Sequence, residues 1–455
     1  MSDINNLRDK IDKITFDILK LLKERNDIAK EIGNLKSNLG IGVTNEERED
    51  QLRSRVLTLC KEIGLDEKTA MVMLNFLLNE SIKIQSSDKQ THLSVFLKAK
   101  KLEKDGKKII HMEVGEPDFL PPEIVKNALS EVYDKRYTKY GDSRGMPEFR
   151  DALANYVTEK FEVKTLSQNI LVSPGARFSI FLAISSLLNP GNEIIVIEPA
   201  WPAYRDNALN SGIKVRTIHT TLDGKWEPNI KDIENVINQN TKMIVLNYPN
   251  NPTGKILPVK LQDQIMDLVI KNDLYVLSDE IYSTYAYKPC KSILTYGYNK
   301  SIITQSFSKS HAMTGFRIGY TISSPDIIEK MSKLQALALT NVSEPIQYVA
   351  MKALEADTDG NVRTIKNRVE SISRRAKTMQ LDFVEPDGAM YLFARVRQDN
   401  FDSVDFTNKL LDAGVAIAPG EGFGNYHGFV RISACQSEDT LNQGMQIIED
   451  GLRSR

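Results

Sequence analysis

Apolar side chains near the start of the chain recur at alternating spacings of four and three positions. They are Leu7, Ile11, Ile14, Ile18, Leu21, Ile28, Ile32 and Leu35. This pattern predicts a helix whose apolar stripe forms the seam of a helical bundle. Arg25 occupies one position of the same series. Because an unpaired buried guanidinium costs several kcal/mol or more, either Arg25 has a partner or the seam opens at that point.

The N-terminal part of the chain shows three helical patterns and no convincing strand. The patterns cover roughly residues 4–38, 45–63 and 67–85. The breaks between them, SNLGIGVTN and IGLD, supply glycine and the asparagine or aspartate that cap helices. We therefore expect an all-α domain over residues 1–87.

Beyond the polar stretch SSDKQTH, short β-rich runs alternate with helical segments. Four of these runs are EIIVI (193–197), KMIVL (242–246), LYVLS (274–278) and SIITQ (301–305). This alternation predicts an α/β domain with a largely parallel sheet. We place a linker at 88–92 and the α/β domain at 93–455.

Composition limits the classes of function. The chain has 455 residues, 41% hydrophobic and 26% charged, the balance of a globular protein with two or three domains. A net charge of −1 gives no reason to expect binding to nucleic acid or to an anionic membrane. The N-terminus lacks an apolar signal core, and no apolar run approaches the roughly 18 residues that cross a bilayer. Cys60, Cys290 and Cys435 are isolated, so we expect a cytoplasmic protein without disulfides or a metal site.

Polar segments follow three of the predicted strands. Lys309 lies in SFSKSHAMTGFRIGY, while NYPNNPTG and SDEIY follow two other strands. Open α/β sheets bind ligands at the carboxyl ends of their strands, so the three segments would converge at one edge. A loop lysine is usually solvated. This convergence makes Lys309 a candidate catalytic residue.

These motifs occur in order in a stretch that resembles class I aminotransferases of the pyridoxal phosphate fold type I superfamily. The resemblance runs from about residue 93 to the end of the chain. It implies a large domain at about 140–345 and a small domain formed by about 93–139 and 346–455. Pyridoxal 5'-phosphate is the implied cofactor.

The resemblance assigns roles to residues around the cofactor ring. Lys309 would join the cofactor covalently and then carry the proton between substrate Cα and cofactor C4′. Asp279 would pair with the pyridine nitrogen. Asn251 and Tyr282 match residues that hydrogen-bond the ring hydroxyl, and Trp201 matches the aromatic residue that stacks on the ring.

The cofactor phosphate needs cations and N–H donors. By the resemblance it is held by Ser306, Ser308 and Arg317, by the backbone amides of Gly175, Ala176 and Arg177, and by Tyr140 of the partner subunit. The three amides lie where a turn enters a predicted helix, and a helix N-terminus favours an anion. The role of Tyr140 implies a homodimer.

The substrate α-carboxylate would be bound by Arg431, in FVRISA, through a bidentate pair. Gly115, in GEPDF, matches the glycine that approaches this site closely. Asn251 and Trp201 also face the substrate in the family. The residue that recognises the rest of the substrate is left unassigned.

Two cations of the first helix lie on one face. Arg25 and Lys36 are eleven residues apart, so on an α-helix they project about 16 Å apart with a drift of roughly 20°. Arg8 lies roughly 100° round the helix from Arg25 and would serve a different copy. The alternative is that Arg25 reaches solvent along its own methylene groups.

Residues 4–85 resemble the all-helical chorismate mutase family. LRDKI, LLKERNDIAKEIGNLK, EERED and ESIKIQ occur in order with that family's spacing. By the resemblance, the carboxylates and the hydroxyl of the substrate are bound by Arg25, Arg48 and Arg8 of the partner subunit. The ether oxygen is faced by Lys36 and Gln85. Glu49 binds the ring hydroxyl, and Ser81 makes a further polar contact. Asn45 stands where an acidic residue is common.

Together the two resemblances imply a bifunctional enzyme of aromatic amino-acid biosynthesis. The first domain would rearrange chorismate to prephenate. The second would transfer an amino group from glutamate or aspartate to prephenate, an arylpyruvate or oxaloacetate. All of these partners are small molecules.

Two other interpretations remain open at this stage. The helical domain could be a non-catalytic dimerisation or effector-sensing module attached to an aspartate or aromatic aminotransferase. It could also bind DNA beside a domain that senses pyridoxal phosphate. Residues 1–88 carry 14 basic and 16 acidic side chains, which argues against DNA binding.

Overall fold

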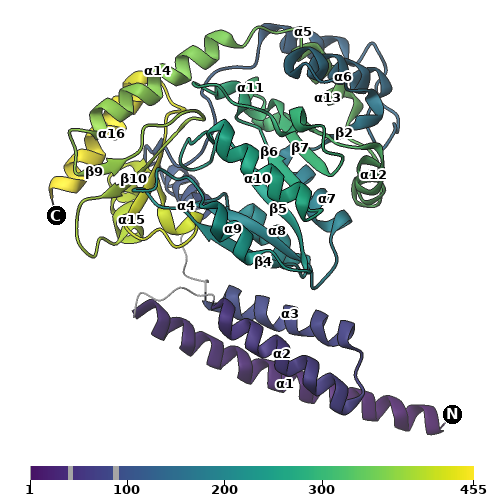
Figure 1. The fold of residues 1–455 in the computed structure, drawn as a ribbon. Helices are drawn as coiled ribbons and strands as arrows, with labels where there is room; N and C mark the ends of the chain where they lie inside the picture. The colour runs from purple at the N-terminus through teal and green to yellow at the C-terminus, as the bar shows by residue number, and fades with distance from the viewer. Residues whose placement is uncertain (1, 39–44, 86–91, 455) are drawn as a thin grey trace. The chain divides into compact units, whose positions relative to one another are not determined.

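The computed structural model describes residues 2–38, 45–85 and 92–454. Two compact units are present, Met1–Lys89 and Gln90–Arg455, and each is described by itself (Figure 1). This separates a helical from an α/β unit, as the sequence predicts. The linker limits and the division of the second unit into a large and a small domain stay predictions.

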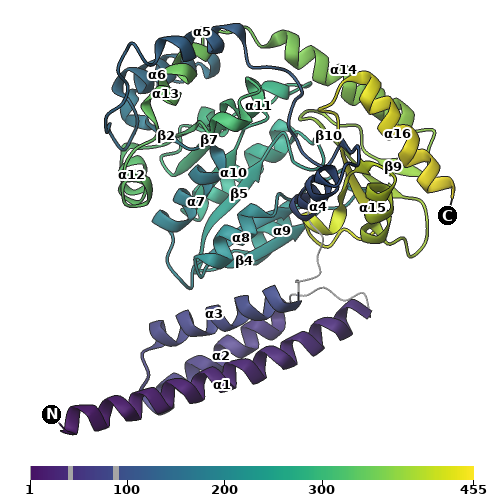
Figure 2. The same cartoon turned by 180° about the vertical axis from the view of Figure 1, so that it is seen from behind.

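The first unit consists of three helices, as predicted. They are α1 (Ser2–Asn38), α2 (Glu46–Ile63) and α3 (Glu67–Gln85), and α3 packs against both α1 and α2 (Figure 2). Asn45 caps the start of α2 by accepting a hydrogen bond from the Arg48 amide at 2.9 Å. Gly64 ends α2 with a φ of 71°, a left-handed conformation that glycine adopts without steric cost.

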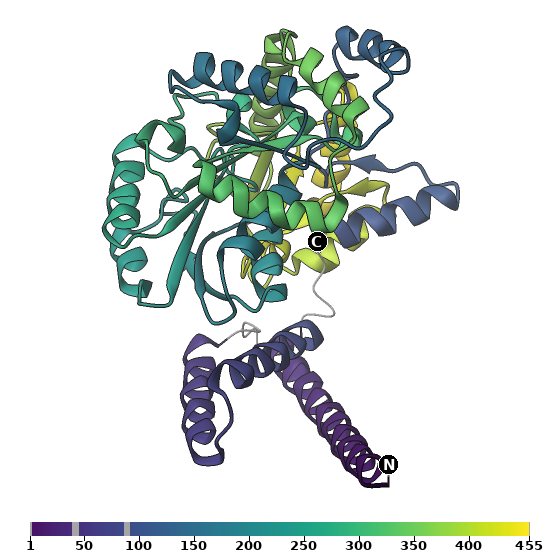
Figure 3. The same ribbon diagram turned by 90° about the vertical axis from the view of Figure 1, so that its right-hand side faces the viewer.

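The predicted seam of α1 is exposed in the single chain. Ile11 is 63% exposed and Leu21 64%, and the N-terminal part of α1 extends beyond α2 and α3 (Figure 3). Against α3, by contrast, α1 presents the half-buried Arg25 and Gly33, where an added Cβ would lie 3.0 Å from Gln85 Cα. Arg25 belongs to the same series as the apolar stripe and has partners on α3, which is the first of the two alternatives that the sequence left open.

A seven-stranded sheet organises the second unit. Its order is β2 (Ile170–Ser173), β8 (Gly319–Ile322), β7 (Ser301–Ser306), β6 (Tyr275–Asp279), β5 (Thr241–Asn247), β3 (Glu193–Glu198) and β4 (Lys214–His219). Only β8 runs antiparallel to its neighbours. The largely parallel sheet and its four predicted strands are confirmed.

Helices cover both faces of this sheet. They are α5 (Glu123–Glu131), α6 (Pro147–Phe161), α7 (Ala176–Leu187), α8 (Ala203–Asn210), α9 (Ile230–Val236), α10 (Val259–Lys271), α11 (Phe307–Ser310), α12 (Pro325–Leu339) and α13 (Glu344–Ala353). Neighbouring strand residues enter opposite cores. Ile194 packs in a cluster with residues of α7, and Ile195 in a cluster with residues of α6 and α10.

The rest of the second unit forms a smaller α/β layer. It contains α4 (His92–Lys104), the strand pair β1 (Ile110–His111) and β11 (Val415–Ala416), an antiparallel sheet of β12 (Ala418–Pro419), β13 (Phe429–Ser433), β10 (Tyr391–Val396) and β9 (Leu381–Phe383), and helices α14 (Asp359–Ala376), α15 (Ser403–Asp412) and α16 (Glu438–Arg453). Short 3-10 turns occur at Ser167–Asn169, Ser283–Tyr285, Ile293–Tyr296, Thr314–Phe316 and Gly420–Phe423.

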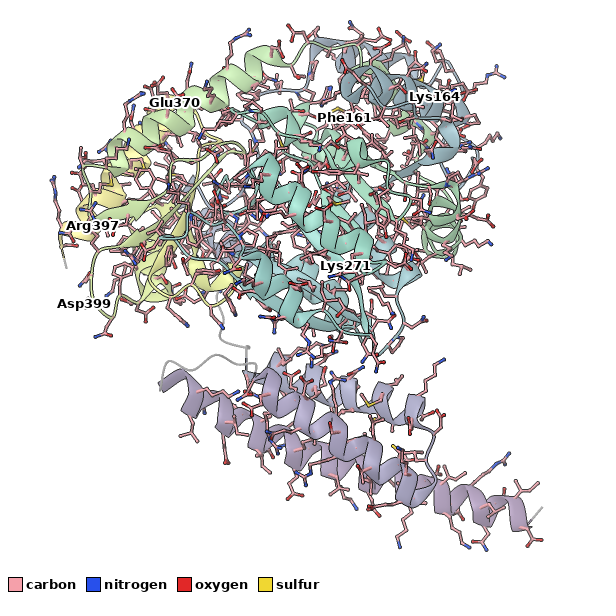
Figure 4. The ribbon with its side chains drawn as sticks, viewed as in Figure 1. Phe161, Lys164, Lys271, Glu370, Arg397 and Asp399 are labelled. Atoms are coloured by element: carbon pink, nitrogen blue, oxygen red, sulfur yellow. The ribbon has the colours of Figure 1, made fainter. Side chains whose placement is uncertain are left out.

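Charged side chains lie on the outside of this unit. Lys271 at the end of α10 and Glu370 on α14 are exposed (Figure 4). None of the described helices combines the length and apolar character needed to cross a bilayer. The described residues also contain no cluster of three or more metal-ligating side chains.

Candidate active sites

A cavity of about 280 Å³ opens in the second unit where β5, β6 and β7 end. Twelve predicted site residues line it: Gly115, Ala176, Arg177, Trp201, Asn251, Asp279, Tyr282, Ser306, Ser308, Lys309, Arg317 and Arg431. The expected convergence of polar segments at one sheet edge is therefore observed. Tyr140 is 88% exposed and does not line the cavity of its own chain.

Lys309 enters the cavity from α11, the short helix that follows β7. Its Nζ donates to the backbone carbonyl of Gly115. Its own carbonyl accepts a hydrogen bond from the Tyr285 hydroxyl at 3.0 Å. Burial lowers the pKa of the Lys309 amine, which increases the share of the uncharged, nucleophilic form.

Asp279 ends β6 and is almost completely buried. Its carboxylate accepts hydrogen bonds from the Tyr204 hydroxyl at 2.6 Å and the Thr304 hydroxyl at 3.2 Å. Burial nevertheless raises the pKa of Asp279 to about 6. A buried carboxylate of this kind is suited to holding a cationic N–H group, because an opposite charge restores its ionised form.

Ser306, Ser308 and Arg317 form an anion-binding corner beside Lys309. Ser306 caps α11 by accepting from the Ser308 amide at 3.1 Å, and it also donates to the Ile318 carbonyl at 3.0 Å. Arg317 Nη1 donates to the Thr314 carbonyl at 2.9 Å. These bonds orient the Ser306 hydroxyl and the Arg317 guanidinium, and Ser308 lines the same cavity.

The start of α7 supplies the other side of this corner. No side chain caps α7, so the amides of Ala176 and Arg177 lie at an uncapped helix N-terminus. The Gly175 amide donates to the Ser173 carbonyl at 2.7 Å, and its predicted role at the phosphate stays a prediction. Gly175 also makes room for Arg317, because an added Cβ would lie 2.8 Å from Arg317 Nη2.

Aromatic rings form one wall of the cavity. The Arg177 guanidinium lies 4.5 Å from the centre of the Trp201 ring, and burial lowers the Arg177 pKa. Trp201 and Tyr204 meet edge to face with their ring centres 5.5 Å apart. Trp201 therefore presents an oriented aromatic face to the cavity.

Arg431 reaches the cavity from β13 and is 2% exposed. Its Nη1 donates to Asn251 Oδ1 at 2.7 Å, and its Nη2 donates to the carbonyl of Glu113. The guanidinium lies between the rings of Tyr391 and Phe423, at 4.4 Å and 4.8 Å. Its buried Nε has no hydrogen-bond partner among the described residues. A buried and oriented guanidinium that has an N–H group without a partner is suited to binding a carboxylate.

Five further polar residues of the cavity lining were not singled out from the sequence. They are Glu116, Tyr204, Asn247, Thr314 and Tyr391. The first four lie inside the motifs GEPDF, EPAWPAY, NYPNNPTG and SFSKSHAMTGFRIGY, so proximity to assigned residues could have identified them. Tyr391 carries no such signal, because it occupies a regular position of strand β10.

The residues of this cavity fit pyridoxal phosphate. A lysine of lowered pKa, a deep carboxylate and an anion-binding corner surround one volume. The cofactor has a carbon that bonds to an amine, a ring nitrogen that takes a proton and a phosphate. Arg431 lines the same cavity and is not needed by the cofactor.

The helical unit brings a second set of predicted residues together. Arg25 Nη1 donates to Ser81 Oγ at 2.5 Å and to the Leu77 carbonyl at 2.7 Å. Burial lowers the Arg25 pKa. The alternative that Arg25 simply reaches solvent is therefore not observed, because it is half-buried against α3.

Lys36 of α1, Glu49 of α2 and Gln85 of α3 are further members of the predicted set. Burial lowers the Lys36 pKa, and the nearby Glu49 carboxylate opposes that shift. Gln85 Oε1 is buried without a hydrogen-bond partner among the described residues. Arg48 is exposed at the start of α2, and the exposed Arg8 makes a long hydrogen bond, 3.5 Å, to Asn5.

Comparisons with known proteins assign a family to each of the two units. Residues 107–448 match the family described as aminotransferase class I and II, and residues 7–86 match chorismate mutase type II. An aspartate aminotransferase of Thermotoga maritima is 36% identical over 79% of this chain and 95% of the relative. A probable aspartate/prephenate aminotransferase of Aquifex aeolicus is 29% identical over 79% of this chain and 95% of the relative.

Solved structures give the same result. The crystal structure of the T. maritima aspartate aminotransferase superimposes with a TM-score of 0.76, covering 79% of this chain and 96% of that one. Aspartate aminotransferase from Thermus thermophilus with maleate gives a TM-score of 0.77 at 28% identity, covering 81% and 98%. The chain therefore belongs to the class I and II aminotransferases, which use pyridoxal phosphate, and carries a chorismate mutase type II domain ahead of the aminotransferase domain.

Proposed function

We propose that this protein is a bifunctional enzyme of aromatic amino-acid biosynthesis. The helical unit converts chorismate to prephenate, and the second unit transfers an amino group to a 2-oxo acid. The observation that carries the second activity is the cavity that Lys309, Asp279 and Arg431 line together. The co-occurrence of both units in one chain links the two reactions.

Bound pyridoxal phosphate supplies a ring that accepts the electron pair released at the substrate Cα. The buried carboxylate of Asp279 pairs with the protonated ring nitrogen and keeps the proton on it. Asn251 and Tyr282 orient the ring hydroxyl, and Trp201 covers the ring face. Lys309, with its lowered pKa, takes the proton from the substrate Cα and delivers it to C4′.

The phosphate of the cofactor is bound by Arg317, by the hydroxyls of Ser306 and Ser308, and by the first backbone amides of α7. We assign the remaining donor to Tyr140 of the partner subunit. Tyr140 is 88% exposed, and Leu120 and Tyr133 are similarly exposed at 86% and 84%. Large exposed rings and aliphatic side chains of this kind support a homodimer that covers them.

Arg431 binds the α-carboxylate of the amino donor and of the 2-oxo acid, with Gly115, Asn251 and Trp201 beside it. Prephenate is itself a 2-oxo acid and the product of the first unit, so it is our preferred acceptor. The probable aspartate/prephenate aminotransferase among the relatives supports this choice. Arylpyruvates and oxaloacetate are the other acceptors, with glutamate or aspartate as donor.

The rearrangement in the helical unit needs no nucleophile and no metal. It needs a compact substrate conformation and stabilisation of the negative charge that grows on the ether oxygen. Lys36 and Gln85 meet the second need. Arg25 and Arg48, with Glu49 and Ser81, hold the substrate groups.

Arg8 of the partner subunit completes this second site. The apolar stripe of α1 is exposed in the single chain, with Leu7 59% and Ile14 60% exposed. A second copy of the helical unit would cover this stripe and bring its own α1 alongside.

A specific observation favours the alternative for the helical unit. Arg25 already donates to Ser81 and to the Leu77 carbonyl, so it has a structural role even without substrate. In that case the unit is a dimerisation or effector-sensing module of an aspartate or aromatic aminotransferase.

The test is to incubate the cofactor-loaded protein with chorismate and either glutamate or aspartate at mildly alkaline pH and to separate the products. Arogenate supports both activities with prephenate as acceptor. Prephenate without amination keeps the mutase and directs the search to arylpyruvates and oxaloacetate. If chorismate remains unchanged, the helical unit has no mutase activity, and the alternative of a sensing module is supported.

A further inference from the structure

Tyr391 contacts three functional parts of the cavity at once. Its hydroxyl lies 2.7 Å from the Tyr282 hydroxyl, and its ring faces the Arg431 guanidinium at 4.4 Å. At Gly115 an added Cβ would lie 1.8 Å from Tyr391 Oη. Tyr391 therefore occupies the space that a side chain at Gly115 would fill, next to the carbonyl that Lys309 contacts.

We propose that Tyr391 is a positioning residue that turns the Tyr282 hydroxyl hydrogen toward the cofactor ring oxygen and thereby helps to set the pH at which the Lys309-linked cofactor loses its proton. This inference rests on the proposed transaminase function. It assigns a role to a residue that the motifs leave out.

The direction of the hydrogen bond follows from the surroundings of the two tyrosines. Each hydroxyl has one hydrogen, so only one of the pair can donate to the other. The Arg431 cation opposes the rise in the pKa of both hydroxyls, but it faces the ring of Tyr391 at 4.4 Å, which makes Tyr391 the more acidic hydroxyl and the better donor. Burial raises the pKa of Tyr391 to about 12 and that of Tyr282 well above its ordinary value, so both keep their hydrogen at neutral pH.

Donation by Tyr391 leaves the hydrogen of Tyr282 available to the cavity. Both tyrosines line that cavity, and their rings meet edge to face with centres 5.6 Å apart. A donor to the ring oxygen favours the form that has lost its proton. Hydrogen bonds in a chain strengthen one another, so the Tyr391 hydroxyl should lower the pH midpoint.

The ring of Tyr391 has a separate effect from its hydroxyl. It lies against Arg431, with Phe423 on the other side of the guanidinium. Tyr391→Phe removes the hydroxyl and keeps this ring contact. Tyr391→Leu removes both, so the two variants distinguish action through Tyr282 from support of Arg431.

The experiment titrates the absorption spectrum of the cofactor-loaded full chain against pH. Loss of one net hydrogen bond corresponds to roughly 0.3 to 1 pH unit, so Tyr391→Phe should raise the midpoint by that amount. Affinity for maleate, an unreactive dicarboxylate, should stay within about twofold in Tyr391→Phe and fall in Tyr391→Leu. Tyr298→Phe, whose hydroxyl donates to the Leu274 carbonyl at 3.0 Å outside the cavity, is the matched control.

A double-variant cycle tests the route through Tyr282. In a Tyr282→Phe background, Tyr391→Phe should cause no further shift, because its partner is gone. An unshifted midpoint in the single variant, or an equal shift in both backgrounds, would overturn the inference. Absence of any Lys309-dependent absorption band would overturn the proposed function together with this inference, whereas a normal band with an unshifted midpoint overturns the inference alone.

Discussion

Arg431 and Asn251 lie 180 residues apart in the chain, yet Arg431 Nη1 donates to Asn251 Oδ1 at 2.7 Å. The bond joins strand β13 to the loop that follows β5. Together with the carbonyl of Glu113 it engages both terminal nitrogens of the guanidinium. The orientation of Arg431 is thus set before a substrate arrives, which reduces the entropy lost on binding.

Replacing Arg431 by lysine should raise the KM for both the amino donor and the 2-oxo acid. Lysine cannot form the bidentate pair, and loss of a charge-assisted hydrogen bond of about 1.5–3 kcal/mol corresponds to roughly 10- to 150-fold. Steady-state kinetics measure this change. Arg395→Lys is the control, because Arg395 lies on the neighbouring strand β10 but is exposed and paired with Asp382 at 3.2 Å. An equal rise in KM for both variants would remove Arg431 from the substrate site.

Asp279→Asn should stabilise the cofactor-free protein at pH 8 while weakening cofactor binding. A folded-state pKa near 6 against an ordinary 3.8 makes burial of the ionised form cost up to about 3 kcal/mol. This cost develops as pH rises from about 4 to 6 and is fully present above pH 6. The Tm difference between variant and wild type should therefore shrink between pH 8 and pH 4.5.

Asp263→Asn provides a control of opposite sign. Hydrogen bonds from Tyr296 and Lys291 lower the Asp263 pKa, so its charged form contributes stability above the ordinary pKa. The asparagine variant should have a lower Tm at pH 8. If Asp279→Asn also lowered the Tm at pH 8, its burial cost would not be the dominant contribution.

Lys309→Ala should abolish amination and leave chorismate conversion intact. Lys309 lies in the second unit, whereas the proposed mutase residues lie in the first. Product chromatography after incubation with chorismate and glutamate should show prephenate accumulating without arogenate. Continued amination would show that another group moves the proton.

Arg25→Ala should reduce chorismate turnover roughly 10- to 150-fold, since it removes a charge-assisted bond to a substrate carboxylate. Transamination of an added 2-oxo acid should be unchanged. Arg53→Ala is the matched control, because Arg53 Nη1 likewise connects its helix to α3 through Asn75 at 2.7 Å. Equal losses in both variants, accompanied by altered assembly in size-exclusion chromatography, would support the dimerisation module.

His111→Gln should lower stability more at pH 6 than at pH 9. A hydrogen bond with Glu113 at 2.7 Å is the main reason that the His111 pKa is raised. A raised histidine pKa contributes stability that is full below the unfolded-state value and is lost as pH rises through the folded-state value. Thermal unfolding at the two pH values measures this difference. A larger effect at pH 9 would mean that His111 is not stabilised as the charged form.

The sequence by itself determined the elements and most of the candidate chemistry. Helical and strand patterns depend on local spacing, so α1, α2 and α3 and the strands β3, β5, β6 and β7 were predictable. Lys309 and Asp279 were also predictable, because parallel strands bring their carboxyl ends to one edge whatever their order. These inferences need no knowledge of how distant segments pair.

Tertiary structure decided what depends on pairing and on faces. The antiparallel register of β10 and β13 sets Phe393 opposite Arg431, which places Tyr391 two residues away on the same face. No local pattern specifies that register. The contact between Arg25 and α3 could not be predicted for a similar reason. Periodicity places residues around a helix but does not determine which face of that helix packs against α3. Spacing is a property of one segment, whereas contact depends on the packing of several segments against one another.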